Sequence, residues 1–248
     1  TIPNSVGLRT NKDMSTQEAF GRILVDLARD ESVRRYLVTT APDVATSTNL
    51  GGIINKVGVF SPTERRMWSE DPVMKWAEGP TGQHIELGIS EMNLFLLLGQ
   101  LGLSWDLSRQ PLLAIGTVYD PFVLRGLDAL IYSVYSGSRF IVAGTPSGVT
   151  LAPEGGAHQS TITPSVGMEL PNLTYIEPTF GGALDWLLCD ALARIAAGNV
   201  HNPTATPSDE GAYYFRLTTR PIDQSAFTKA VERMGEPVIR RQVLSGGY

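Results

Sequence analysis

The chain has 248 residues, 42% of them hydrophobic, so it is long enough to bury a substantial core and is not expected to be disordered. Its net charge of −5 is spread over scattered acidic and basic residues, and no basic stripe suggests binding to a phosphate backbone. The longest apolar stretch, 94–103, is interrupted by glycine and glutamine and falls well short of the roughly 20 residues needed to span a bilayer. We therefore expect neither nucleic acid nor a membrane as a partner.

The single cysteine, Cys189, has no partner for a disulfide within the chain, and no charged-then-apolar leader opens the sequence. Both features favour a reducing cytoplasm. Cys189 lies in the apolar run 183–197, where packing in a buried helix is favoured over nucleophilic chemistry.

Predicted strands and helices alternate from residue 16 onward. The first helix follows the capping pair Ser15 and Glu18 and has apolar residues at helical spacing; strands are indicated by short β-branched and aromatic runs. In chain order we expect helix 16–30, strand 36–40, strand 84–89, helix 91–101, strand 111–115, helix 122–136, strand 140–144, strand 173–177, helix 183–197 and strand 213–217. This alternation predicts a doubly wound α/β fold, with a largely parallel sheet and helices on both faces.

The remaining segments lack this pattern. Residues 1–15 are polar and are interpreted as a linker, 43–82 as irregular, and 199–211 as a polar, turn-rich loop. Residues 236–248 resemble the opening strand of a further domain that stops before it could fold. We therefore expect a linker, one domain over 16–235 and the start of a C-terminal domain, in a chain that is part of something larger.

Polar residues follow the predicted strands, where open α/β sheets bind their ligands. Glu91 stands at the junction of a buried strand and an apolar helix, a costly place for a carboxylate without a partner or a task. It could instead be a helix-start acid that interacts with the helix dipole and free backbone N–H groups. Asp43, at the carboxyl end of the first strand, could equally be a turn former.

The sequence Gly88-Ile89-Ser90-Glu91-Met92 resembles the strand-to-helix junction of the transketolase and 2-oxoacid dehydrogenase superfamily. The resemblance implies a thiamine diphosphate enzyme, in which this glutamate hydrogen-bonds the aminopyrimidine ring of the cofactor. A carboxyl group there favours the imino tautomer, whose nitrogen can remove the proton from the thiazolium carbon. The resemblance thus makes Glu91 both a cofactor-binding and a catalytic residue.

The resemblance continues in order along almost the whole chain. Asp43 matches an acidic strand-end motif that approaches the thiazolium side of the cofactor. The stretch 117–122 is similar to an aromatic segment whose rings pack on the pyrimidine, which implies that Tyr119 and Phe122 are cofactor-binding pocket walls. Two aromatics at a loop-to-helix junction are also typical of a protein core.

His158 lies in a Gly-rich loop, 153–160, similar to the family loop whose histidine faces the substrate. The implied catalytic role is to bind the substrate carboxylate or to exchange protons at the developing oxyanion. The alternative is a histidine that merely orders its loop. His84 begins a strand and His201 lies in a polar loop, so neither carries such an argument.

The superfamily binds the cofactor's diphosphate through Mg²⁺, using a Gly-Asp-Gly sequence in a separate diphosphate-binding domain. No Gly-Asp-Gly occurs in this chain. The resemblance therefore implies that the chain supplies the pyrimidine half of the site and no metal ligand. The diphosphate-binding domain would belong to the same or a neighbouring polypeptide.

Within the superfamily, the sequence is most similar to the single-chain, homodimeric pyruvate dehydrogenase decarboxylating component. That resemblance implies oxidative decarboxylation of a 2-oxo acid, pyruvate first, and a lipoyl acyltransferase component as partner. Transketolase-type ketol transfer is one alternative, although it usually needs further histidines and arginines, and the loop offers just His158 while Arg125 and Arg220 are unassigned. A non-catalytic assembly module is another, against which the retention of Glu91 argues.

Overall fold

The computed structural model describes residues 1–65, 74–197 and 211–247. In this part of the chain a single sheet has the strand order β3-β2-β4-β1-β5-β6-β8-β7, and every neighbouring pair is parallel. Its strands are β1 Leu37–Ala41, β2 Val59–Phe60, β3 Glu78–Gly79, β4 His84–Glu86, β5 Leu113–Val118, β6 Ile141–Gly144, β7 Leu173–Ile176 and β8 Ala212–Arg216. The predicted parallel α/β sheet is confirmed.

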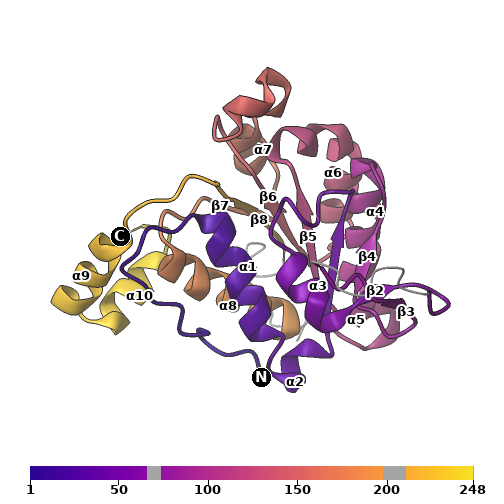
Figure 1. Ribbon diagram of the computed structural model, residues 1–248, viewed down its shortest axis with the longest axis horizontal. Coiled ribbons are helices and arrows are strands. Elements are labelled where there is room, and N and C mark those ends of the chain that lie inside the picture. The colour runs from indigo at the N-terminus through magenta and orange to yellow at the C-terminus, as the bar shows by residue number, and fades with distance from the viewer. Residues whose placement is uncertain (66–73, 198–210, 248) are drawn as a thin grey trace.

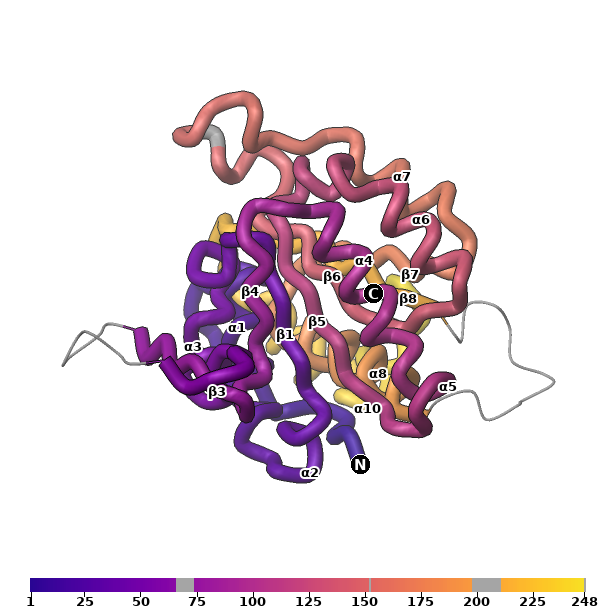
Figure 2. The backbone as a smooth tube through the Cα atoms, turned by 90° about the vertical axis from the view of Figure 1, so that its right-hand side faces the viewer, coloured from indigo at the N-terminus to yellow at the C-terminus, as the bar shows by residue number. Residues whose placement is uncertain are grey.

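Helices cover both faces of the sheet (Figures 1 and 2). One face packs against α1 Thr16–Leu27, α3 Gly51–Val57 and α8 Gly181–Ala197, and the other against α4 Glu91–Gly102, α6 Leu127–Tyr135 and α7 Thr163–Glu169. On β5, Ile115 belongs to the first core and Ala114 to the second. Such alternation within a wholly buried strand is typical of a parallel sheet covered on both faces.

The other described elements are short or lie outside these layers. They are α2 Glu31–Arg34, α5 Ser104–Ser108, the 3₁₀ helices η1 Asp120–Gly126, η2 Ala152–Glu154 and η3 Gly156–His158, and the final helices α9 Ser225–Met234 and α10 Glu236–Leu244. No helix among the described residues is long and apolar enough to cross a membrane.

Local sequence fixes where the two principal helices begin. Ser15 caps α1 by accepting a hydrogen bond from the Glu18 backbone N–H at 3.1 Å, as the capping pair predicts. Ser90 caps α4 in the same way, accepting from Asn93 at 3.4 Å. Gly88, with φ +67°, permits the turn between β4 and that cap. The result is that Glu91 becomes the first residue of α4.

Residues 236–244 form a helix and not the expected opening strand. Ile239 and Val243 lie one helical turn apart and are both buried, and they pack with Trp186 of α8. Pro237 falls in the first turn, where a helix tolerates it because no intrahelical N–H bond is lost there. A short Pro-Val-Ile sequence resembles a strand, but the spacing of the buried residues is helical.

The expectations for three further segments, an irregular region, a helix and a strand, also need correction. Residues 43–82 are not irregular throughout, since they contain α3 and the two-residue strands β2 and β3, which are too short to show a period. The helix expected over 122–136 is a 3₁₀ helix up to Gly126. The strand expected over 84–89 ends at Glu86. The expected loop 199–211, with His201, lies outside the described residues apart from its last one.

Residues 1–15, interpreted as a linker, lie along α8. The Asp185 carboxylate accepts hydrogen bonds from the backbone N–H groups of residues 6–8 at 2.9 to 3.1 Å and from the Ser5 hydroxyl at 2.6 Å. Asp185 is only 1% exposed, so these donors offset the cost of burying its charge. One turn later Cys189 is fully buried, as expected. Burial, and then the Asp185 charge, raise the pKa of its thiol to about 12.

Candidate functional site

The candidate site lies at the carboxyl edge of the sheet. Asp43 follows β1, Glu91 begins the helix after β4, Tyr119 follows β5 directly, and His158 lies in the connection after β6. Because β4, β1, β5 and β6 are consecutive neighbours in a parallel sheet, these connections emerge side by side. The loop that carries η2 and η3 stands above this edge, at the top of Figure 2.

Glu91 is a nearly buried acid with a cationic partner. Its side chain is 9% exposed, and Oε1 accepts a hydrogen bond from Arg125 Nη1 at 3.4 Å. Within the described part of the chain, Arg125 is the only group bonded to this carboxylate, which leaves Oε2 open. The start of α4 also favours a negative charge, through the free N–H groups and dipole of the helix.

An unbroken series of contacts runs from Glu91 to His158. The guanidinium of Arg125 lies over the Phe122 ring, and the Phe122 and Tyr119 rings stack with centres 6.0 Å apart and planes 16° apart. His158 lies edge-on to both rings, with ring centres 5.8 Å from Tyr119 and 5.4 Å from Phe122. We call these five residues the Glu91–His158 cluster. Four of them are residues that the sequence had singled out.

His158 ends η3 and combines partial exposure with an open ring nitrogen. Its side chain is 29% exposed, and Nε2 lies 3.8 Å from Glu154 Oε2. Nδ1 is buried and has no hydrogen-bond partner among the described residues. A buried polar atom without a partner is uncommon in proteins and suits a ligand group that would satisfy it.

Asp43 lies at the same edge but outside the cluster. It is exposed and adopts a left-handed backbone conformation, with φ +63°, which aspartate tolerates better than most residues other than glycine, as in a turn. Its backbone N–H donates to Glu86 Oε1 at 2.7 Å, and Glu86 Oε2 lies 3.3 Å from Nε2 of the buried His84. His84 Nδ1 in turn lies 3.0 Å from the Thr39 hydroxyl. This polar chain holds the Asp43 backbone in place.

Sequence reasoning missed three residues that organise the site: Arg125, Glu86 and Asp120. Arg125 follows Phe122 by three residues, a spacing that places two side chains on one side of a helical turn. Asp120 and Glu86 are acids at the carboxyl ends of buried strands, the argument that selected Glu91 and that applies equally to them.

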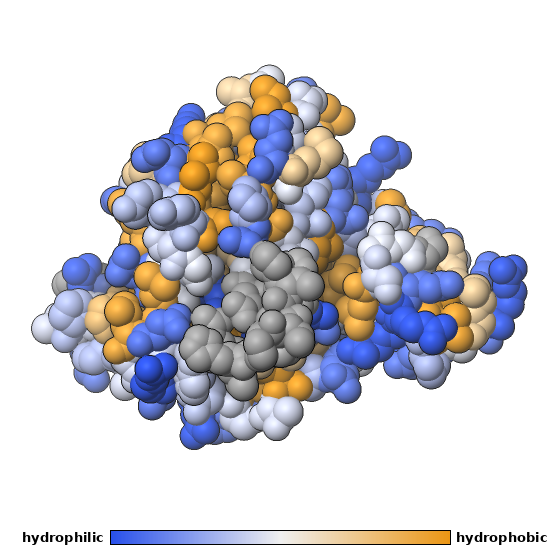
Figure 3. Space-filling model, turned by 180° about the vertical axis from the view of Figure 1, so that it is seen from behind, coloured by the Kyte–Doolittle hydropathy of each residue, from blue (hydrophilic) through white to orange (hydrophobic). Residues whose placement is uncertain are grey.

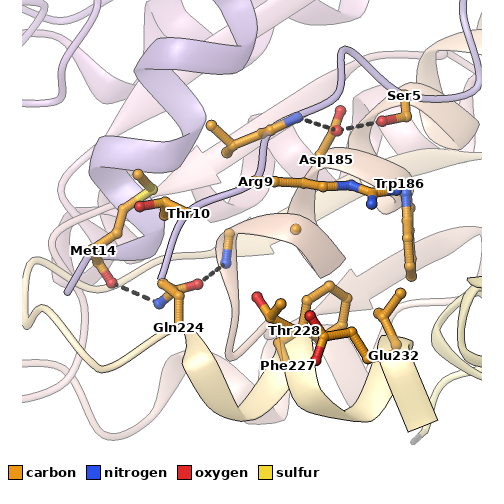
Figure 4. Close-up of a pocket in the computed structure, with 14 residues that line it drawn as sticks. Ser5, Arg9, Thr10, Met14, Asp185, Trp186, Gln224, Phe227, Thr228 and Glu232 are labelled. Atoms are coloured by element: carbon orange, nitrogen blue, oxygen red, sulfur yellow. Dashed lines mark hydrogen bonds between the residues drawn. The ribbon is translucent and has the colours of Figure 1, made fainter. Parts of the chain in front are cut away.

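The described residues contain no group of three or more His, Cys, Asp or Glu side chains that could hold a metal ion. A hollow of about 90 Å³ lies elsewhere, between the N-terminal segment, the start of α8 and α9 (Figure 4). Trp186 and Phe227 form its apolar walls, and its buried polar groups, Asp185 and Gln224, already bond to protein atoms. This hollow shares no residue with the Glu91–His158 cluster, so we place the site at the cluster.

A large apolar surface adjoins Glu91. Hydrophobic side chains gather on the upper part of the molecule in Figure 3, where Figure 1 places α4, α6 and α7. We call the part formed by α4, η1 and α6 the α4–α6 face; its exposed apolar residues are Met92, Leu96, Leu124, Ile131, Tyr132 and Tyr135. Contiguous exposed apolar surface is typical of an interaction site.

By fold and site, the chain is a doubly wound α/β domain with an acid, an aromatic pair and a histidine gathered at the carboxyl edge of its sheet. Its residues 1–203 match the family described as the pyruvate dehydrogenase E1 component middle domain. The chain belongs to this family, and the resemblance drawn from the sequence is confirmed.

Curated relatives named pyruvate dehydrogenase E1 component are similar to most of this chain. The relative from Escherichia coli (strain K12) is 22% identical over 237 residues, which cover 94% of this chain and 25% of the relative. The relative from Buchnera aphidicola subsp. Acyrthosiphon pisum is 23% identical over 211 residues, 84% of this chain and 23% of the relative. The chain spans about a quarter of the length of these relatives.

Solved transketolase structures share the fold. Transketolase from Leishmania mexicana has a TM-score of 0.66 at 17% identity, over 88% of this chain and 27% of its own. Transketolase from Campylobacter jejuni has a TM-score of 0.65 at 16% identity, over 90% of this chain and 28% of its own. A structure titled "Split gene transketolase, inactive beta4 tetramer" has a TM-score of 0.52 at 18% identity, over 84% and 52%.

Proposed function

We propose that the chain supplies the pyrimidine half of a thiamine diphosphate site in a pyruvate dehydrogenase E1 component, an enzyme that oxidatively decarboxylates a 2-oxo acid, pyruvate first. The observation that carries this proposal is Glu91, a 9% exposed carboxylate at the start of α4 that contacts, through Arg125, an aromatic pair and a histidine. A buried acid is costly unless it has a task, and a cofactor ring nitrogen would give it one.

The residues present fit the pyrimidine ring of this cofactor. Oε2 of Glu91 is open to a ring nitrogen, since Arg125 bonds Oε1. The stacked rings of Tyr119 and Phe122 offer the flat apolar surface that suits a heteroaromatic ring. His158 Nδ1, buried and without a partner in the described part of the chain, would be satisfied by an oxygen of the substrate in the tautomer that carries a proton there.

When bound, thiamine diphosphate supplies the carbon nucleophile and stores the electrons released on decarboxylation. Glu91 holds and exchanges one proton at the pyrimidine nitrogen. Tyr119 and Phe122 orient the ring and keep water from it. His158 binds the substrate carboxylate or exchanges a proton with the substrate oxygen. Asp43 is the residue on the thiazolium side, and Glu86 fixes its backbone through the N–H bond.

The other half of the site is proposed to come from a diphosphate-binding domain, of the same or a neighbouring polypeptide, which also holds Mg²⁺. The chain's span of about a quarter of its relatives supports a multidomain arrangement, and the α4–α6 face offers apolar surface beside Glu91. We propose a cytoplasmic homodimer that works with a lipoyl acyltransferase component. In it, 16–235 would be the pyrimidine-binding domain, 1–15 would lead into it and 236–248 would start the next domain.

Two other functions have less support. Transketolase-type ketol transfer agrees with the fold of the solved neighbours, but the family match and the curated relatives are pyruvate dehydrogenase E1 components. A non-catalytic assembly module gives no reason for a nearly buried carboxylate with one open oxygen at the start of α4.

The experiment that tests the proposal uses the chain assembled with its diphosphate-binding partner, thiamine diphosphate and Mg²⁺. Three reactions are measured side by side: carbon dioxide release from pyruvate, carbon dioxide release from larger 2-oxo acids, and ketol transfer from a ketose phosphate. We expect decarboxylation of pyruvate to exceed the other reactions. Dominant ketol transfer would favour the transketolase alternative, and the absence of cofactor binding would favour an assembly module.

A further inference from the structure

Asp120 is a fully buried carboxylate between Tyr119 and Phe122 in the chain. Its Oδ2 accepts hydrogen bonds from the Thr163 hydroxyl at 2.7 Å, from Arg216 Nε at 3.0 Å and from the Ser160 hydroxyl. Its Oδ1 accepts from the Tyr214 hydroxyl. Four donors on one carboxylate offset the cost of burying its charge.

The four donors come from two separate parts of the fold. Tyr214 and Arg216 belong to β8, within the sheet, whereas Ser160 lies in the connection between β6 and α7 and Thr163 is the first residue of α7. Burial, and then the Asp120 charge, raise the pKa of Tyr214 well above its usual range, so its hydroxyl keeps the proton that it donates. Asp120 thus ties the connection that follows β6 to the sheet.

Ser160 closes the base of the loop that carries His158. Its backbone N–H donates to the Gly148 carbonyl at 2.9 Å, and its hydroxyl accepts from the Gly148 N–H at 3.2 Å. Arg216 Nη2 donates to the Ser160 carbonyl at 3.0 Å. Ser160 is two residues from His158, and Asp120 is next to Tyr119. The hydrogen bond from Ser160 to Asp120 therefore links the segment that carries His158 to the segment that carries Tyr119, the two residues whose rings are in contact.

We propose that Asp120 is a positioning residue that holds His158 over the Tyr119–Phe122 pair by anchoring Ser160. The inference rests on the proposed function, which gives His158 its role toward the substrate. Asp120 does not touch substrate or cofactor. Its contribution is to fix the position of the His158 loop relative to the sheet. The loop otherwise contacts the cluster through the edge-on packing of His158 against Tyr119 and Phe122, which is weak and tolerates displacement.

The test compares two variants in the assembled enzyme, Ser160→Ala and Tyr214→Phe. Each removes one hydroxyl that donates to Asp120, but only Ser160 belongs to the His158 loop, where its hydroxyl also accepts from the Gly148 N–H. Asp120→Asn keeps that acceptor, so it is measured beside them and should also speed exchange in 148–160; normal exchange in Asp120→Asn would assign the effect to the Ser160–Gly148 bond and overturn the role of Asp120. Hydrogen–deuterium exchange is measured first, without cofactor. Ser160→Ala should speed exchange of backbone amides in 148–160, and Tyr214→Phe should not, although it can lower the melting temperature by as much or more.

Kinetics then test the consequence for His158. Ser160→Ala should lower kcat by about 10- to 100-fold, the loss expected when a catalytic group is displaced by about 1 Å. Tyr214→Phe should retain most turnover. Ser160→Ala combined with His158→Ala should be no slower than His158→Ala alone, because a group that acts only through His158 adds nothing once that side chain is gone.

The results separate this inference from the proposed function. Equal loop exchange in the two variants, equal loss of turnover, or additive losses in the double variant would each overturn the role of Asp120 while leaving His158 intact as a catalytic residue. Normal turnover of His158→Ala would overturn both the positioning role of Asp120 and the proposed catalytic role of His158.

Discussion

The guanidinium carbon of Arg125 lies 3.9 Å from the centre of the Phe122 ring. From this position the same side chain reaches the Glu91 carboxylate, with 3.4 Å between Nη1 and Oε1. One cation therefore fixes both the acid and an aromatic wall of the site. Because the Arg125 side chain is 56% exposed, we expect a moderate energetic contribution and not a large one.

Arg125→Met should weaken thiamine diphosphate binding in the assembled enzyme by about 3- to 10-fold, since an exposed cation–ring contact and a partly exposed ion pair contribute about 1 kcal/mol together. Calorimetry at low and high salt measures the loss. Arg125→Lys keeps the charge but not the planar group, so its affinity for thiamine diphosphate should fall between those of the wild type and Arg125→Met. Wild-type affinity in Arg125→Met would show that the contact does not organise the site.

Glu91→Gln should fold normally and lose most activity, because an amide cannot supply the proton that a carboxyl group shares with the pyrimidine nitrogen. Hydrogen–deuterium exchange at the thiazolium carbon of the bound cofactor should slow sharply. Glu18→Gln is the matched control, since Glu18 is also an acid in the first turn of a helix but lies on α1, outside the site. Normal exchange and turnover in Glu91→Gln would remove the proposed role of Glu91.

His158→Ala should bind cofactor nearly normally, since His158 is proposed to act on the substrate and its loop to overhang the thiazolium and not the buried pyrimidine. Turnover should fall by roughly 10²- to 10⁴-fold, the range for loss of a positioned acid or base. Cofactor affinity, melting temperature and pyruvate turnover are measured on the same variant. A loss of turnover that weaker cofactor binding fully explains would mean that His158 only orders its loop.

The 248-residue chain without its diphosphate-binding partner should bind thiamine diphosphate and Mg²⁺ negligibly, because most of the affinity is proposed to come from the diphosphate-binding domain, whose Gly-Asp-Gly sequence does not occur in this chain. Adding the partner should restore binding. Replacing Tyr132 on the α4–α6 face by a charged residue should weaken that restoration if the face contacts the partner. Tight, Mg²⁺-dependent binding by the chain alone would contradict a divided site.

The sequence revealed the parts of the site that follow local rules. Glu91 stands out as an acid between a strand and an apolar helix, and Ser15 and Glu18 predict the start of α1. The same local rule marks Asp120 as an acid after a buried strand, but its role as an anchor depends on Tyr214, 94 residues away, and no local pattern records that contact. The two-residue strands β2 and β3 were missed for the same reason, since they are defined only by pairing with distant segments.

The contact between the N-terminal segment and Asp185 gives residues outside the regular elements a role in solvating a buried charge. Residues 6–8 direct their backbone N–H groups at one buried carboxylate, and so act as its solvation shell in place of water. A protein cut before Thr16 would contain every regular element of the sheet, but the Asp185 carboxylate would lose these donors and would have to be solvated by water at the start of α8. Residues 5–8 therefore contribute to the fold by solvating a single charge, although they precede the first segment with hydrophobic periodicity.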